Sequence, residues 1–236
     1  MAGLQDIINQ ASSIEINRRK VVGQQITRNQ IPRTSLTPTR VPWRFSVEMP
    51  AKLSWWDNRG LIEYLDNLDA YSPQTLNFSN SCIAWIFRYQ GVCTLGQLNA
   101  LTVSSIVGTN ITLAGFSGAG ITPGAVVFQP NDLIQIGANP YPFTSVNQVL
   151  APSGNTITFQ TSRPMDFLSP LAYGGAGITV GPTCNFNVFC PNMPTYKLVP
   201  GNYYNYITNN SEAVVNNARI EFSDVFELYE WVGGAA

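Results

Sequence analysis

The chain of 236 residues contains no histidine. Histidine is the commonest general base and metal ligand, and the usual partner of a catalytic serine or cysteine. None of the four cysteines forms a C-x-x-C pair, and their flanking residues are apolar or typical of strands. We therefore expect no enzyme activity, no metal and no cofactor, and we interpret the cysteines as small buried side chains in a reduced compartment. These cysteines are Cys82, Cys93, Cys184 and Cys190.

Charged residues are also scarce. They make up 11% of the chain, against about 25% in average proteins. The formal net charge is −1, which argues against a dedicated nucleic-acid-binding protein, because such proteins usually carry a basic domain. A surface this poor in charge must be hydrated by Asn, Gln, Ser and Thr, or be buried against other subunits.

Long apolar runs are missing as well. No stretch approaches the ~18 apolar residues that a membrane-spanning helix needs. The first ten residues, MAGLQDIINQ, lack the basic and apolar regions of a secretory signal. The expectation is a protein made in the cytoplasm that has no membrane partner.

The N-terminal region predicts a short helix followed by a long hairpin. Leu4, Ile7 and Ile8 have helical spacing. Residues 13–26 and 40–50 are rich in strand-forming residues, with Phe45 and Val47 alternating against polar neighbours. The prolines and polar residues of 27–39 indicate a long hairpin tip.

Residues 57–71 give the clearest helical pattern. Leu61, Ile62, Leu65 and Leu68 form an apolar stripe, while Glu63, Asp66 and Asp69 face away from it. Asp57 or Asn58 is the expected N-cap, and Ser72–Pro73 the expected end. Residues 74–80 and 82–92 then predict two strands.

The composition changes between residues 94 and 182. This segment has only Asp132, Arg163 and Asp166 as charges and is dense in Gly, Thr, Asn and Pro. Short strands separated by turn signals predict a small antiparallel barrel or sandwich. The glycine-rich stretches at 118–124 and 175–181 match no phosphate-binding motif and are interpreted as turns. The expected strands are 104–109, 110–116, 125–129, 132–137, 141–150, 155–161 and 176–181.

The C-terminal region is predicted to return to the first domain. A Tyr/Asn-rich loop at 202–217 precedes a last strand at 218–232. Residues 1–52 hold eight basic and three acidic side chains, whereas 205–236 hold one basic and five acidic, so the ends have opposite charge. We therefore predict a mainly β protein with few helices, in which a discontinuous domain (1–93 and 183–236) carries a small β-domain inserted at 94–182.

Residues 18–47 carry seven basic side chains and no acidic one. Three interpretations stay open: an assembly element that adds strands to a neighbour's sheet, a solvated hairpin, and an arm that binds nucleic-acid phosphates. We favour the first, with the basic residues meeting acidic rims of adjacent subunits. The interface hypothesis names Arg18, Arg19, Lys20, Arg28, Arg33, Arg40, Glu221, Asp224, Glu227 and Glu230.

The order of these elements resembles that of the tail-tube and tube-initiator proteins of tailed bacteriophages. The resemblance covers about 140 residues in two pieces and rests on arrangement, since no single motif is diagnostic. The inserted segment looks like the small β-domains of phage minor tail and baseplate proteins. The stretches that carry it are PWRFSVEMP, RGLIEYLDNLD, TLNFSN, WIFRYQG and FSDVFELYEW, and in the insertion PNDLIQIGANPYPFTSVNQV and CPNMPTYKL.

The resemblance implies a tail-tube-like β-sandwich with a flanking helix at 57–71 and a long hairpin at 18–47. Six copies would join their sheets into a ring, and DNA would at most pass through its lumen. The insertion is too large for a plain tube subunit, so it favours a ring at the junction of tube and baseplate in the virion. The implied partners are the tail tube protein and baseplate hub and wedge proteins.

An alternative prediction is a binding module whose inserted β-domain contacts carbohydrate or a host receptor. It depends on aromatic side chains expected to be exposed. These are Tyr141, Tyr203, Tyr204 and Tyr206.

Overall fold

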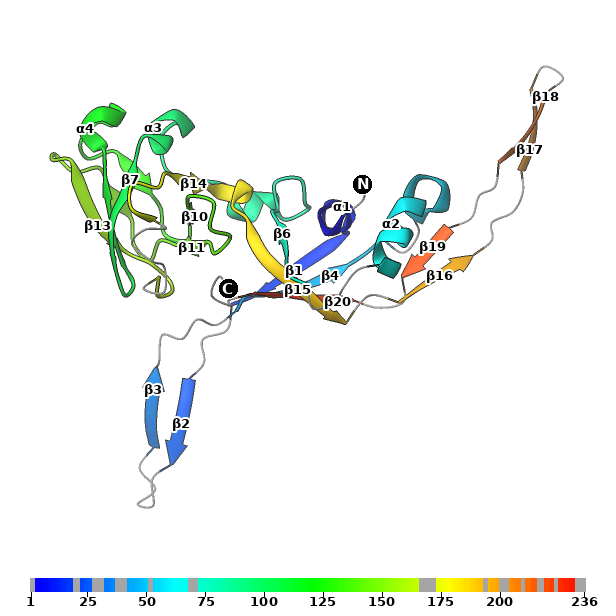
Figure 1. Ribbon diagram of the computed structural model, residues 1–236, viewed down its shortest axis with the longest axis horizontal. Helices are drawn as coiled ribbons and strands as arrows, with labels where there is room; N and C mark the ends of the chain where they lie inside the picture. Colours follow the sequence, from blue (N-terminus) through cyan, green and yellow to red (C-terminus); the bar gives the residue numbers. More distant parts are fainter. Residues whose placement is uncertain are drawn as a thin grey trace.

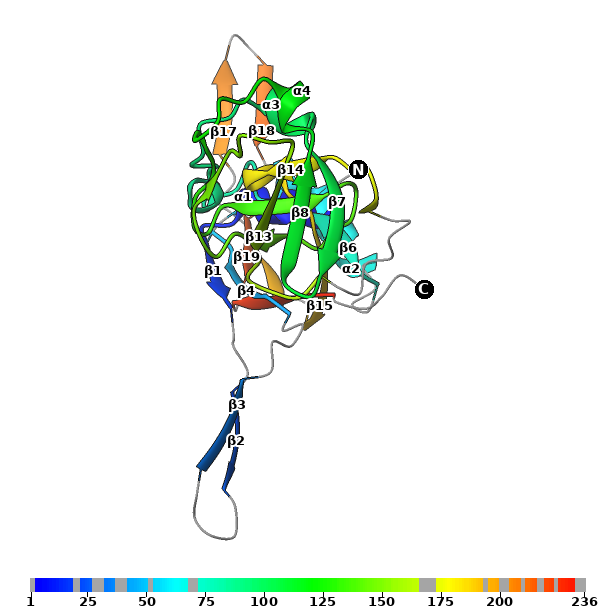
Figure 2. The same cartoon turned by 90° about the vertical axis from the view of Figure 1, so that its left-hand side faces the viewer.

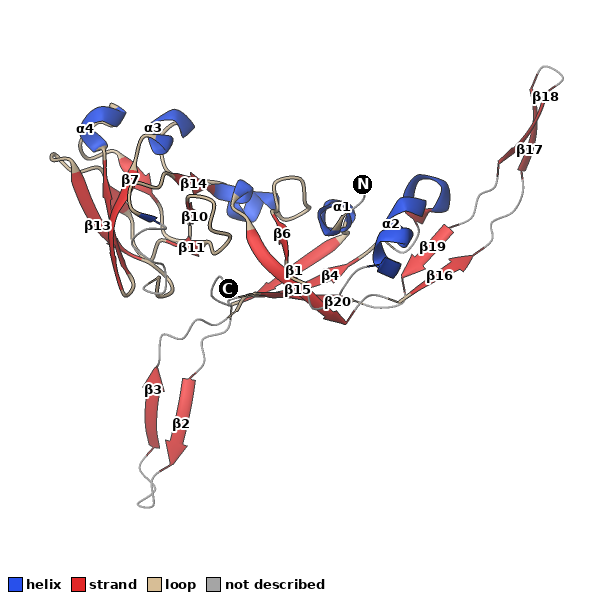
Figure 3. Ribbon diagram, viewed as in Figure 1, coloured by secondary structure: helices blue, strands red, loops and turns tan. Residues whose placement is uncertain are grey.

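A computed structural model gives the fold, which is mainly β with a few short helices (Figures 1 and 3). The strands belong to several separate antiparallel sheets. The structure describes residues 3–18, 22–26, 32–36, 42–50, 53–67, 72–165, 173–192, 195–199, 204–208, 211–215, 219–222 and 225–231.

A five-stranded antiparallel sheet forms the centre of the molecule. Alternate residues of its strands, such as Phe45 and Val47, are fully buried, which confirms the alternation expected from the sequence. The short helix predicted near the N-terminus is α1 (Leu4–Gln10), which buries Leu4, Ile7 and Ile8 in the same core. The strands, in order across the sheet, are β1 (Ser13–Asn17), β4 (Arg44–Glu48), β20 (Phe226–Glu230), β15 (Phe186–Asn192) and β6 (Gln74–Leu76).

An aromatic cluster fills this core. Phe45 packs against Phe78 and Phe186 with ring centroids 5.0 and 5.2 Å apart. Trp43 lies 5.3 Å from Phe186 and stacks on Phe87 at 6.4 Å. Offset and edge contacts at these separations add to the free energy gained from burying the rings.

Residues 13–48 form the predicted long hairpin. Its base is the β1–β4 pair, and its outer part is the pair β2 (Val22–Ile26) and β3 (Pro32–Leu36). The tip expected at 27–39 therefore contains strand β3. Its proline, Pro32, is compatible with a strand because it occupies the first position, where a missing N–H is tolerated.

A second long hairpin was not predicted. Its base pairs β16 (Tyr196–Val199) with β19 (Arg219–Phe222), and its outer part pairs β17 (Tyr204–Thr208) with β18 (Ser211–Val215). The expected loop at 202–217 thus contains two strands. Their Tyr, Ile and Val residues are common in strands, and this preference outweighs that of the flanking asparagines for loops. Figures 1 and 2 show the outer parts of the two hairpins projecting in different directions from the central sheet.

The remaining predictions in this region need three corrections. Helix α2 (Trp55–Asn67) begins before Asp57 and Asn58, so neither caps it, and residues 68–71 lie outside the described part. Residues 82–92 contain a 3₁₀ turn, η1 (Ala84–Phe87), instead of a strand. Only Phe87 of this turn is buried. The last expected strand is split between β19, which pairs with β5 (Leu53–Ser54), and β20 in the central sheet.

The insertion contains a second cluster of buried side chains, drawn from residues 93–180. Its strands form sheets of two or three, and the described residues form no closed barrel. Its two short helices were not predicted, although the capping box of Thr94 and Gln97 signals the first. The sheets are β7 (Thr102–Val107), β8 (Asn110–Ala114) and β13 (Thr156–Gln160); β10 (Leu133–Ile136), β11 (Phe143–Thr144) and β14 (Ile178–Val180); and β9 (Val126–Phe128) with β12 (Val149–Leu150). The helices are α3 (Leu95–Asn99) and α4 (Phe116–Ala119), and the 3₁₀ turn η2 (Gly181–Thr183) follows β14.

Candidate interaction surfaces and the domain junction

A buried ion pair joins the insertion to the central sheet. Arg163 donates from both terminal nitrogens to the carboxylate of Glu230 on β20, at 2.6 and 2.7 Å. Arg163 also donates to the carbonyl oxygen of Pro142. The two residues are 5% and 1% exposed, so this bidentate pair is shielded from water.

Trp43 is part of the same cluster. Its backbone N–H donates to Glu230 Oε2 at 3.0 Å, and the N–H of Glu230 donates to the Trp43 carbonyl at 2.9 Å. The guanidinium carbons of Arg18 and Arg163 lie 4.3 and 5.1 Å from the centre of the indole ring, and that of Arg163 lies 3.6 Å from the centre of the Tyr141 ring. Two cations on aromatic rings and one carboxylate therefore meet where the insertion joins the sheet.

Backbone groups on both sides extend this junction. Asn185 N–H donates to Gln135 Oε1 at 2.6 Å, and Gln90 N–H donates to Asp132 Oδ1 at 2.9 Å. Asp132 also accepts from Gln129 N–H at 2.8 Å. Burial raises the pKa of the Asp132 carboxyl, and the N–H groups that bond to it oppose that shift. Asp132 is thus a structural residue of the junction.

The acidic half of the predicted interface is largely used within the chain. Glu230 is buried against Arg163, so it is not available to a neighbouring subunit, and this member of the hypothesis is wrong. Glu227 pairs with Arg44 on β4, and Glu221 pairs with Arg219 on its own strand. Strand β20 also lies inside the sheet, between β4 and β15.

Two members of the basic half, Arg18 and Arg33, lie within the described residues. Arg18 lies against Trp43 at the base of the first hairpin. Arg33 belongs to β3, of which the structure describes the backbone pairing with β2. The other interface candidates lie outside the described residues; they are Arg19, Lys20, Arg28, Arg40 and Asp224.

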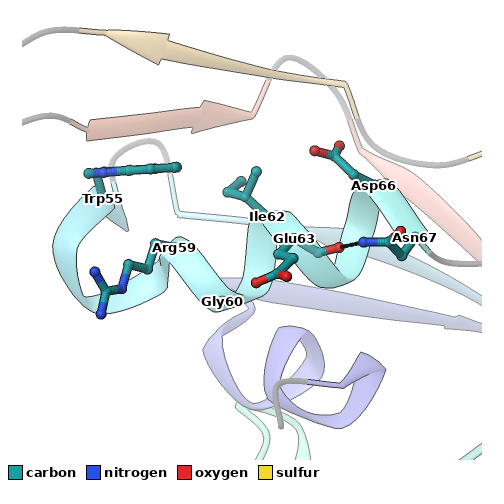
Figure 4. A pocket seen from close by; sticks show the side chains of 7 residues that line it. All are labelled: Trp55, Arg59, Gly60, Ile62, Glu63, Asp66 and Asn67. Atoms are coloured by element: carbon teal, nitrogen blue, oxygen red, sulfur yellow. Dashed lines mark hydrogen bonds between the residues drawn. The ribbon is translucent and has the colours of Figure 1, made fainter.

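A shallow hollow of about 460 Å³ follows the exposed side of α2 (Figure 4). Glu63 and Asp66 point outward here as predicted, and Asp66 accepts from the Tyr196 hydroxyl at 2.8 and 3.0 Å. Asn67 donates to the Glu63 carbonyl at 2.7 Å (Figure 4). The lining comes entirely from α2 and places no nucleophile beside a base. It consists of Trp55, Arg59, Gly60, Ile62, Glu63, Asp66 and Asn67.

Three of the four cysteines are buried as expected, and Cys82 is exposed. Burial raises the pKa of the thiols of Cys93 and Cys184, which disfavours their reactive thiolate forms. Within the described part of the chain, no three Cys, Asp or Glu side chains gather as metal ligands would.

Of the four tyrosines in the alternative prediction, the structure describes the side chain of Tyr141 alone, and this one is not exposed. Tyr141 is 4% exposed and lies beneath Arg163. Tyr203 lies outside the described residues, and Tyr204 and Tyr206 belong to β17, whose backbone alone is described.

Comparison with known proteins found neither a matching protein-family model nor a matching curated protein. Among the helices that the structure describes, none has the length and apolar character needed to cross a membrane.

Proposed function

We propose that the chain is a structural protein of a phage virion, which forms a ring at the junction of the tail tube and the baseplate. The observation that carries the proposal is the pair of long β-hairpins that project in different directions, one continuing from β1 and β4 of the central sheet and the other from the β16–β19–β5 sheet (Figures 1 and 2). The two hairpins are the elements by which one subunit binds the next in the proposed ring.

Stability supports this role for the hairpins. An isolated two-stranded ribbon is marginally stable at best in water, and three strands or a packed face are normally required. Within the described residues, β2–β3 and β17–β18 are two-stranded ladders that pair with no third strand. A neighbouring subunit that covers the ribbons would supply the missing contacts.

Charge supports it as well. Residues 18–47 have seven basic and no acidic side chains. Glu221 and Glu230 are held by Arg219 and Arg163, which lie outside residues 18–47. Of the seven basic residues, Arg44 is paired with Glu227 at the base of the hairpin. The basic residues nearer the tip therefore need other anionic groups, which adjacent subunits, the tail tube protein or baseplate hub and wedge proteins would provide.

Ring formation closes the open edges of the sheet. The outer strands of the five-stranded sheet are β1 and β6, and neither pairs with a further strand in the described part of the chain. Open edges invite uncontrolled association, and a closed ring removes them. In line with tail-tube proteins, we propose a hexamer, with DNA passing through the lumen and no catalytic role.

The test is the assembly state of the purified protein, measured by mass photometry and negative-stain imaging. Rings of one cyclic symmetry are expected, and Arg33→Glu/Arg40→Glu should abolish them. Arg59→Glu/Arg88→Glu is the matched control, since both residues are exposed and lie outside the two hairpins. A protein that forms no rings at its highest soluble concentration contradicts the proposal, and so do rings that survive Arg33→Glu/Arg40→Glu while DNA retention is lost.

A further inference from the structure

The central sheet buries one of its faces and leaves the other open. Side chains alternate along a strand, so Phe45, Phe186 and Leu228 fill the core while their neighbours lie on the opposite side. None of the described side chains on that opposite side is buried. Figure 1 shows α1 and α2 on the core side of the sheet and β2–β3 projecting away on the other side. We call this other side the open face; it includes Glu15, Arg44, Glu48, Phe189, Glu227 and Tyr229.

A row of aromatic rings crosses the open face. Phe189 lies 5.8 Å from Tyr229 and 5.7 Å from Trp231, measured between ring centroids. The Tyr229 hydroxyl donates to Glu227 Oε2 at 2.6 Å, and the guanidinium carbon of Arg44 lies 5.5 Å from the centre of the Tyr229 ring. Arg44 also pairs with the Glu227 carboxylate. The open face therefore already holds one guanidinium against both a ring and a carboxylate, which is an arrangement suited to binding arginine.

The open face is also acidic. Glu15 and Glu48 are exposed, and neither forms a salt bridge with another described residue. Glu227 and Arg44 neutralise each other. Three carboxylates and one guanidinium leave the described part of the open face with a formal charge of −2. Such a surface repels phosphate groups and favours a cationic partner.

The chain itself contains a segment of complementary charge. We call the outer part of the first hairpin, residues 19–41, the basic ribbon; it holds five basic side chains and no acidic one. The pairing of β2 with β3 places Arg33 on one face of the ribbon, together with Gly23 and Ser35, and Thr34 on the other face. The first of these faces thus combines a cation with small residues.

We propose that the open face binds the basic ribbon of a second copy of this chain, with the face that holds Arg33 turned toward Glu15 and Glu48. The cations of the ribbon then supply the counter-ions that these carboxylates lack and lie across the aromatic row. The ribbon continues from β1 and β4 and projects away from its own sheet, so the occupant is a second copy (Figure 1).

This contact rests on the proposed function, in which the ribbon binds another subunit, and it identifies the surface that receives the ribbon. Each copy gives one ribbon and receives one. A head-to-tail contact of this kind can close into a ring, because the two surfaces that meet are different.

Carbodiimide coupling of the full chain tests the contact, because this reagent joins an amine to a carboxylate only where the two touch. Arg33→Lys keeps the positive charge of the ribbon and supplies the amine. In an equal mixture of isotope-labelled and unlabelled protein, mass spectrometry should find this amine joined to Glu15 or Glu48 of a differently labelled copy. Thr34→Lys is the matched control, since it lies on the opposite face of the ribbon, and it should couple weakly.

Charge exchange gives a second criterion, measured by mass photometry on variants first shown to be folded by their thermal melting curves. Glu15→Lys/Glu48→Lys should abolish the association of copies, and adding Arg33→Glu/Arg40→Glu to the same chain should restore it. The control is a matched change of charge at exposed positions of α2, on the core side of the sheet. This control, Glu63→Lys/Asp66→Lys, should leave association intact.

Three results would overturn the proposed contact. They are coupling only between groups of one copy, equal coupling of Arg33→Lys and Thr34→Lys, and association that survives Glu15→Lys/Glu48→Lys or is not restored by the exchange. Rings that form without coupling refute the contact and leave the ring proposal standing. Coupled dimers without rings support the contact and contradict the ring.

Discussion

Arg163 and Glu230 form a bidentate ion pair, 67 residues apart in sequence, which links the insertion to an interior strand of the central sheet. Glu230 also accepts the backbone N–H of Trp43, so the carboxylate bonds to the residue before β4 as well. The pair therefore ties the insertion to the central sheet at a point that is shielded from water.

Removing one member of this pair should be costly. Arg163→Ala leaves the Glu230 carboxylate buried without a counter-ion, and the free energy of unfolding is expected to fall by about 3–5 kcal/mol. Urea denaturation measures this value. The double variant Arg163→Met/Glu230→Met should recover most of the loss, because no charge then remains buried.

The pair of Arg219 and Glu221 provides the comparison. These side chains are 41% and 34% exposed, so Arg219→Ala should cost no more than about 1 kcal/mol. If Arg163→Ala proves as mild as Arg219→Ala, the ion pair does not hold the junction.

Trp43 should be energetically coupled to the arginine beside it. Trp43→Phe keeps an aromatic ring in the core but weakens its attraction for the Arg163 guanidinium, 5.1 Å from the ring centre. A double-mutant cycle with Arg163→Met should give a coupling of about 0.5–2 kcal/mol. Trp231→Phe, on a residue 42% exposed, is the control and should show no coupling to Arg163. Additive losses at Trp43 and Arg163 would contradict the role of the indole ring.

The sequence predicts well those elements whose pattern is local. The apolar spacing of Leu4, Ile7 and Ile8 and the alternation at Phe45 and Val47 reflect which face each element buries, and both predictions are confirmed. The 3₁₀ turn at 84–87 is missed because its apolar residues resemble a strand, although Trp85 is 74% exposed.

The site is less predictable than the elements. Partners such as Arg163 and Glu230 are brought together only by the tertiary fold, so the charge pattern of the C-terminal strands suggests an intersubunit rim where the structure has intrachain pairs. The sequence contained one clue to these contacts. The segment 94–182 has only three charged residues, so each of them was a candidate for a specific structural role. Two of the three, Asp132 and Arg163, are buried in the structure.

Asp132 should be essential to the attachment of the insertion. Asp132→Ala leaves the N–H groups of Gln90 and Gln129 without their acceptor, and because both hydrogen bonds are part-buried, a loss of about 1–2 kcal/mol is expected. Hydrogen exchange at Gln90 should accelerate selectively. Asn131→Gly is the neighbouring control, because Asn131 is exposed and has φ +71°, a conformation that glycine adopts freely. An unchanged exchange rate at Gln90 would show that Asp132 does not fix this segment.

The cysteines should react as one exposed thiol and three hidden ones. Cys82 is exposed, whereas Cys93, Cys184 and Cys190 are buried, so DTNB is expected to modify Cys82 alone in the native protein and all four in urea. Burial raises the pKa of Cys93 and Cys184, so raising the pH from 7 to 8.5 should not bring these two thiols into reaction. Cys82→Ser is the control and should abolish native labelling. Rapid modification of Cys184 in folded protein would mean that the contact between the insertion and the sheet opens, because this thiol lies against the carbonyl oxygens of Leu133 and Thr179.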